Sequence, residues 1–125
     1  LRPVDPAARV RDLSLTGIGI VAADKAVSVE YERKRPEERR YANWQERILT
    51  QLHTALDLLD QAAKRGELAA GPELRPGDIA AAIAWGFCRF VIPEFVDEAR
   101  WPALAAQARA CEALGAFEAW PIDRE

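Results

Sequence analysis

The fold is decided by residues 75–90, whose sequence reads RPGDIAAAIAWGFCRF. Pro76 suits the first position of a helix, because its missing N–H would have no partner there. Asp78 follows two residues later, where its carboxylate can accept from free backbone N–H groups and lies in the favourable field of the helix N-terminus. The run that follows carries a single charge, Arg89. Because other helices pack against a helix this apolar, the stretch predicts a buried central helix beginning near Asp78 and ending near residue 93.

Three further helices are predicted around this one. The first spans about residues 6–34, with Asp5 as its N-cap. The second begins at residue 36 or 43, runs to 65, and stops at Gly66. The last spans about residues 102–114 and leads into a tail. We find no strand pattern and no internal repeat, so the sequence predicts one all-α domain, a helical bundle over residues 1–125.

Apolar spacing assigns one face to each of the two long helices. In the first helix, steps of three, four or seven join Val10, Leu13, Ile20, Val27 and Tyr31. In the second, the same kind of spacing joins Trp44, Ile48, Leu52, Leu56 (with Ala55), Leu59 and Ala63. Gly17 and Gly19 interrupt the first helix, and each costs about 1 kcal/mol relative to alanine in a helix interior. In the central helix, Trp85 and Phe90 are expected in the core.

Charge and composition exclude several classes of partner. Seventeen basic residues against 20 acidic ones give a net charge of −3, whereas nucleic-acid binding favours a basic excess and a membrane-surface helix favours lysines beside an apolar stripe. We therefore expect neither a nucleic-acid nor a membrane partner. No signal peptide or transmembrane segment appears, which favours a cytoplasmic protein. The chain opens on Leu1 and has no methionine, which suggests a fragment or a processed product.

Single residues with reactive side chains suggest structural roles. Cys88 and Cys111 lie in alanine-rich helical surroundings, so we expect small buried thiols, with a disulfide or a reactive thiol as the alternative. His53 is the only histidine and is expected to be half-exposed, and without a second histidine or a cysteine cluster a metal site has no support. Asp57 and Asp60, three residues apart, are expected on a solvated face.

Four short stretches carry a family resemblance when they are taken in order. They are ERKRPEER at 32–39 (followed by Trp44), GDIA at 77–80, WPAL at 101–104 and LGAF at 114–117. In this order they resemble the first interhelical turn, the buried helix with its capping aspartate, and the closing segment of the C-terminal domain of bacterial glutathione transferases. The resemblance covers nearly the whole chain. It implies that domain's fold, in which the charged stretch 30–40 is a solvated corner between two helices.

Two positions depart from the family pattern. Arg75 stands where the family usually has serine or threonine, so half of the reciprocal capping box is absent, a loss of about 1 kcal/mol. Gly115 stands where the family has a proline. Neither departure changes the expected fold.

The resemblance also implies a division of labour. In the family, an N-terminal thioredoxin-like domain binds glutathione and activates its thiol, and that domain needs strands and a cis-proline turn. This sequence shows neither, so no catalytic residue and no cofactor are assigned to it alone. Glutathione is then a co-substrate of an intact protein only, and the partners implied are the missing thioredoxin-like domain, a second subunit and a small hydrophobic electrophile.

The implied role of this domain is one wall of the electrophile pocket and much of a homodimer interface. The candidate pocket residues in the first helix are Thr16, Gly17, Ile20, Val21 and Asp24. Phe87, nine residues past Asp78, matches a position where some relatives place an aromatic side chain against the co-substrate. The alternatives are packing at a dimer seam for the first helix and core packing for Phe87.

Two other functions stay open for a domain of this fold. One is a non-catalytic protein–protein interaction module, and the other is a ligand-sensing domain of a regulator. An open apolar cleft between the first helix and the central helix favours the enzyme, because ligand pockets are concave and mostly apolar. A filled face favours the interaction module.

Overall fold

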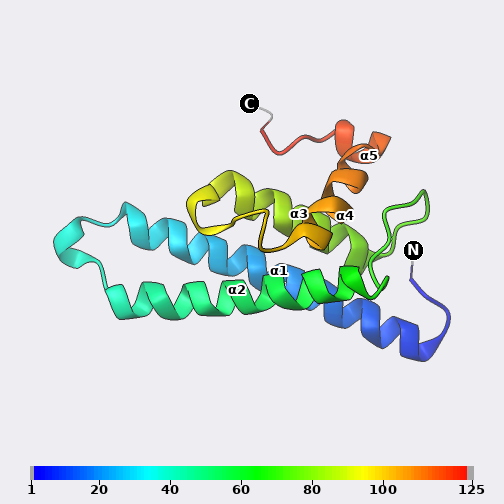
Figure 1. Ribbon diagram of the computed structural model, residues 1–125, viewed down its shortest axis with the longest axis horizontal. Coiled ribbons are helices and arrows are strands. Elements are labelled where there is room, and N and C mark those ends of the chain that lie inside the picture. The colour runs from blue at the N-terminus through cyan, green and yellow to red at the C-terminus, as the bar shows by residue number, and fades with distance from the viewer. Residues whose placement is uncertain (1, 124–125) are drawn as a thin grey trace.

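The computed structural model describes residues 2–123, and these fold into helices without any strand. The helices are α1 (Pro6–Lys34), α2 (Ala42–Lys64), α3 (Pro76–Val91), α4 (Pro102–Glu112) and α5 (Gly115–Glu118), with 3₁₀ turns at Glu37–Arg39 and Pro93–Phe95. The long helices α1 and α2 run antiparallel, and α3 and α4 pack against them (Figure 1). The predicted all-α bundle is confirmed, and its central helix starts beside Asp78 and packs against both α1 and α4.

Helix ends follow the signals in the sequence. Asp5 caps α1, since its Oδ2 accepts from the backbone N–H of Ala8 at 2.8 Å. Gly66 follows α2 with a φ of 72°, a conformation that glycine adopts without steric cost. For α2, the later of the two predicted starts agrees with the structure: the 3₁₀ turn Glu37–Arg39 stands apart, and the helix itself begins at Ala42.

The core is built from buried residues of α1, α2, α3 and α4. On α2, the predicted stripe is confirmed at Ile48 to Leu59, whereas Trp44 at its beginning is exposed. On α3, Trp85 is buried but Phe90 is 58% exposed, so the prediction of a core position for Phe90 is wrong. Phe90 lies on an exposed face of α3. Because this helix is apolar on all sides, its sequence does not indicate which face is exposed.

On α1, the predicted stripe of large apolar residues is exposed, and the buried face carries smaller residues. The predicted apolar stripe does share one face, but all five of its members, from Val10 to Tyr31, are exposed. The buried face consists of Asp12, Leu15, Gly19, Ala22, Ala26, Val29 and Glu32. Small residues are needed there because α3 approaches closely: a Cβ at Gly19 would lie 2.9 Å from the carbonyl oxygen of Ala80.

The Asp78 carboxylate ties the start of α3 to the preceding loop. Its Oδ2 accepts from the backbone N–H of Arg75 at 2.8 Å, and its Oδ1 accepts from that of Ala69 at 2.7 Å. The Arg75 guanidinium pairs with the same carboxylate at 3.2 Å and donates to the Glu67 carbonyl oxygen at 3.0 Å. An ion pair therefore occupies the place of the serine or threonine hydroxyl that a capping box would supply.

Two acidic residues expected on solvated surface are buried caps instead. Oδ1 of Asp60 accepts from the backbone N–H groups of Ala103 and Leu104, both at 2.9 Å, and so caps the start of α4. Glu32 closes the corner between α1 and α2 by accepting from the N–H of Tyr41 at 2.7 Å. These predictions were wrong because each carboxylate accepts from free backbone N–H groups at the start of a different helix, and such contacts cannot be read from local sequence.

Asp57 and His53 hold the segment that leads into α4. Oδ1 of Asp57 accepts from the Trp101 indole N–H at 2.7 Å. The half-buried His53 ring lies 5.3 Å from the Trp101 ring, and its Nε2 is 2.9 Å from the Phe95 carbonyl oxygen. Both side chains therefore have structural roles.

Candidate functional site

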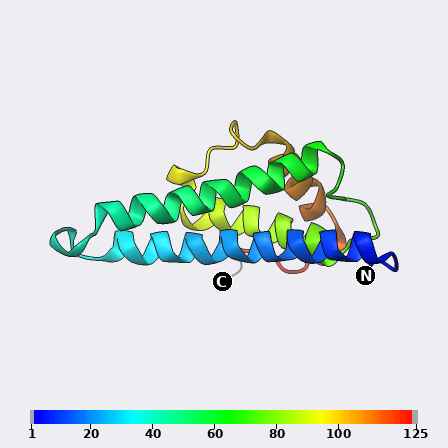
Figure 2. The same cartoon turned by 90° about the horizontal axis from the view of Figure 1, so that it is seen from below.

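Two hollows are lined only by residues of α1 and α3, and we call them together the α1–α3 groove. One end is a hollow of about 460 Å³ whose walls include Thr16, Ile20, Ile79 and Ile83. The other end is a hollow of about 410 Å³ between the last turns of the same two helices. Its lining includes Val27, Tyr31, Phe87, Phe90 and Val91. In Figure 2, α1 and α2 lie side by side and α3 lies behind them.

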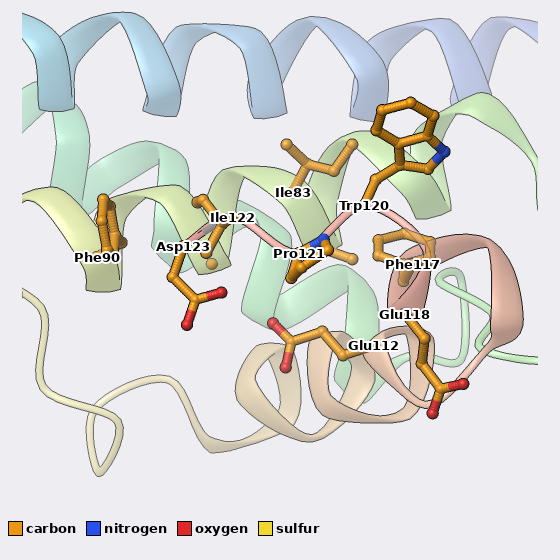
Figure 3. A pocket seen from close by; sticks show the side chains of 11 residues that line it. Ile83, Phe90, Glu112, Phe117, Glu118, Trp120, Pro121, Ile122 and Asp123 are labelled. Atoms are coloured by element: carbon orange, nitrogen blue, oxygen red, sulfur yellow. The ribbon is translucent and has the colours of Figure 1, made fainter. Parts of the chain in front are cut away.

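A third hollow, the tail pocket, lies where α3, the end of α4 and residues 117–123 meet (Figure 3). Its volume is about 550 Å³. It shares Ile83 with the first hollow of the groove and Phe90 with the second. The three hollows therefore form one continuous apolar surface along the outer side of α3.

Charges at the far end of the groove are paired with one another. Arg33 donates hydrogen bonds to Glu30 and Glu94, and to the Val91 carbonyl oxygen at 2.8 Å. The bond to Glu30 raises the pKa of Arg33, and the neighbouring Lys34 lowers the pKa of Glu30. This end thus offers polar groups at the rim of an otherwise apolar wall.

The structure distributes the six residues predicted from the sequence over different surfaces. Thr16 and Ile20 line the first hollow of the groove, and Phe87 lines the second. Gly17 and Val21 line a separate hollow of about 670 Å³ between α1 and α2. The Asp24 side chain is exposed and pairs with Lys25 at 3.3 Å, outside the hollows described here.

Sequence reasoning missed four residues of the uncovered surface, namely Tyr31, Ile83, Phe90 and Trp120. Ile79, Ile83 and Phe90 recur at helical spacing on α3, but that helix has no polar face to mark one side as outward. Tyr31 belonged to the stripe identified on α1, so its spacing was recognised but its exposure was not.

The two cysteines are free and buried, as predicted. Burial raises the pKa of the Cys88 thiol to about 12, and its Sγ lies 3.8 Å from the Ala22 carbonyl oxygen. The pKa of Cys111 is also raised, by burial and then by the Asp78 carboxylate. Because the thiolate is the nucleophile, neither side chain is suited to attack a substrate.

Two kinds of feature are absent from the described residues. Across 2–123, no three histidine, cysteine, aspartate or glutamate side chains gather closely enough to hold a metal ion. Within the same range, every helix is too short or too polar to cross a bilayer.

Comparison with known proteins identifies the fold. Neither a protein-family model nor a curated protein sequence matches the chain. A crystal structure of a glutathione transferase from Methylobacterium radiotolerans, in complex with glutathione sulfonate, matches 95% of the chain with a TM-score of 0.83 and 27% identity. A glutathione transferase family member from Pseudomonas fluorescens, with bound S-(propanoic acid)-glutathione, matches 94% with a TM-score of 0.81 and 25% identity. A Methylobacillus flagellatus enzyme with glutathione bound shares the fold at 22% identity, with 95% coverage and a TM-score of 0.83.

The chain accounts for only part of each of these proteins. It spans 56% of the Methylobacterium chain, 60% of the Pseudomonas chain and 59% of the Methylobacillus chain. The order of helices, the capped central helix and these matches agree with the resemblance seen in the sequence. The chain has the fold of the C-terminal helical domain of glutathione transferases.

Proposed function

We propose that this domain forms one wall of a pocket for a small hydrophobic electrophile, in a protein whose thioredoxin-like domain binds glutathione. The observation that carries the proposal is the uncovered α1–α3 groove. Ile20, Ile83 and Phe90 are each more than half exposed along it. Contiguous apolar surface of this kind usually marks a binding site or an interface.

The composition of the groove lining suits the binding of an apolar ligand. Aliphatic and aromatic side chains form its walls, while Arg33 and Glu30 provide polar groups at one end. Ligand pockets commonly have this composition, because apolar contact supplies affinity and a few polar groups set orientation. An open groove of this kind favours the enzyme over the interaction module. The matching proteins bind glutathione or glutathione derivatives, which supports a proposal of glutathione conjugation for the intact protein.

The hollow between α1 and α2 is the surface that we propose for a homodimer interface. Gly17, Val21 and Leu58 line it, and Val21 and Leu58 are both exposed. Leu58→Arg would place a charge in this interface, so the mutated full-length protein should sediment as a monomer. A dimer that persists in this variant would assign the interface elsewhere.

The pocket is tested by steady-state conjugation of glutathione to 1-chloro-2,4-dinitrobenzene by the full-length gene product. Phe90→Ala should raise the KM for the electrophile about tenfold, because lost apolar contact in a pocket is worth 1–3 kcal/mol. The KM for glutathione should not change. Trp44→Ala, which removes an exposed aromatic ring of α2 outside the groove, is the matched control.

Two outcomes would contradict this assignment. One is a Phe90→Ala enzyme whose KM for the electrophile equals that of the control, and the other is an effect confined to glutathione. The 125-residue chain alone should give no turnover above the protein-free rate, because the resemblance places thiol activation in the other domain.

A further inference from the structure

Arg33 joins the two helices of the α1–α3 groove at the end where its lining stops. On α1, Arg33 and Lys34 are the last residues that line the second hollow, and on α3 the last is Val91. Nη2 of Arg33 donates to the Val91 carbonyl oxygen at 2.8 Å, across 58 residues of sequence. This hydrogen bond therefore spans the groove and closes its end.

The guanidinium of Arg33 is held from three directions. Its Nε donates to Glu30 on the same helix, its Nη1 to Glu94 in the 3₁₀ turn after α3, and its Nη2 to Val91. The Val91 carbonyl belongs to the last turn of α3, where the helix dipole favours a positive charge. Because the planar guanidinium presents its donors in a fixed fork, three acceptors hold it more firmly than a surface arginine with one partner.

Lys34, the next residue, provides a comparison within the same hollow. It lines this end of the groove and carries the same charge as Arg33. Its Nζ pairs with Glu30 of its own helix at 3.1 Å, and among residues 2–123 it has no ion pair with α3 or the turn after it. The Lys34 side chain is 68% exposed, against 35% for Arg33. Lys34 therefore lies on the rim, whereas Arg33 forms the end wall.

We propose that Arg33 is a specificity-determining residue of the electrophile pocket and limits the length of the electrophile that the groove admits. The inference rests on the proposed function and names the side chain that ends the pocket. The walls before this end are apolar and include Val27, Phe87 and Phe90. An alkyl chain gains contact with these side chains, but its terminus then meets a guanidinium that would lose its hydrogen bonds if it were displaced. Electrophiles that stop short of Arg33 are therefore favoured over longer ones.

Two electrophiles with one reactive group and different chain lengths test the proposal, namely (E)-2-hexenal and (E)-2-dodecenal. In each, glutathione adds across the carbon–carbon double bond, with its sulfur on the β-carbon and its proton on the α-carbon. The quantity measured on the full-length gene product is the ratio of kcat/KM for dodecenal to kcat/KM for hexenal, because a loss of folded enzyme or of thiol activation lowers both values equally. Arg33→Ala should raise this ratio about tenfold through a lower KM for dodecenal, since each methylene group that gains apolar contact is worth up to about fourfold. Lys34→Ala should change the ratio less than about twofold, since an exposed ion pair contributes little.

A further variant tests the wall while leaving Arg33 in place. Glu94→Ala removes one of the three acceptors, on an exposed residue, so the ratio should rise about threefold as the guanidinium loosens. Circular dichroism reports whether each variant keeps its helices. An unchanged ratio in Arg33→Ala, or equal changes in Arg33→Ala and Lys34→Ala, would overturn this inference and leave the proposed function in place. A wild-type protein that conjugates neither the alkenals nor 1-chloro-2,4-dinitrobenzene would overturn both.

Discussion

The two faces of α1 are made from side chains of opposite size. The face that packs against α3 carries Gly19, Ala22 and Ala26, whereas the outward face carries Ile20 and Tyr31. Close contact between helices explains the first face, because bulk there would push α3 away. The second face has no such constraint within this chain. In this helix, therefore, small residues mark the seam inside the domain, while large apolar residues mark the exposed face.

Gly17 and Gly19 of α1 show the same difference between an exposed and a buried face. Both interrupt the helix, and each costs about 1 kcal/mol relative to alanine. A Cβ at Gly19 would lie 2.9 Å from the Ala80 carbonyl oxygen, whereas a Cβ at Gly17 would meet no atom within 4 Å. Gly19 therefore serves packing inside the domain, and Gly17 lies on the surface proposed for the dimer.

The largest expected loss of stability comes from removing the carboxylate that caps α3. Asp78→Ala removes the acceptor of two backbone N–H groups and leaves the Arg75 guanidinium without its partner. Only the Asp78 end of this pair is buried, since the Arg75 side chain is 33% exposed, so the loss should be about 2–3 kcal/mol, compared with about 1 kcal/mol for a simple cap. Urea melts followed by circular dichroism measure the loss. Asp5→Ala, the exposed cap of α1 with one hydrogen bond to Ala8, is the control and should cost about 1 kcal/mol. Equal losses for the two variants would contradict the role given to Asp78.

Helix positions were predictable because their signals are local. Asp5 before Pro6, Gly66 after α2, and Pro76 with Asp78 each act within one helical turn, so the sequence alone located those ends. The corner at Glu37–Arg39 was harder, since a short 3₁₀ turn has the same composition as the start of a helix.

The faces and the site were less predictable because they depend on contacts distant in sequence. Helical spacing grouped Ile20 with Tyr31 correctly, but it cannot say whether a group faces inward or outward. Asp60 looked solvated because the helix start that it caps lies more than forty residues away. Phe87 and Ile20 were candidates for one pocket, and only the packing of α1 on α3 places them at opposite ends of one groove.

A methyl group at the seam should have an intermediate effect. Gly19→Ala forces the new Cβ against the backbone of Ala80, which cannot move aside as a flexible side chain could. Such overpacking costs about 1–3 kcal/mol, more than the gain of about 1 kcal/mol in helix propensity. The midpoint of a urea melt should therefore fall. A midpoint that rises would show that α1 and α3 separate easily, and the seam would then not be the rigid part of the domain.

The same methyl group two residues earlier should have the smallest effect and the opposite sign. At Gly17 the new Cβ enters open space, so Gly17→Ala gains helix propensity with no opposing contact and should stabilise the chain by up to about 1 kcal/mol. Thermal and urea melts of the 125-residue chain, run beside Gly19→Ala, give the comparison directly. In the full-length protein the gain should shrink or reverse if a second subunit covers the hollow between α1 and α2, because the methyl group would then meet the partner. Destabilisation of the chain by Gly17→Ala would contradict the outward position of this face, since only a contact inside the domain could oppose the helix propensity of alanine.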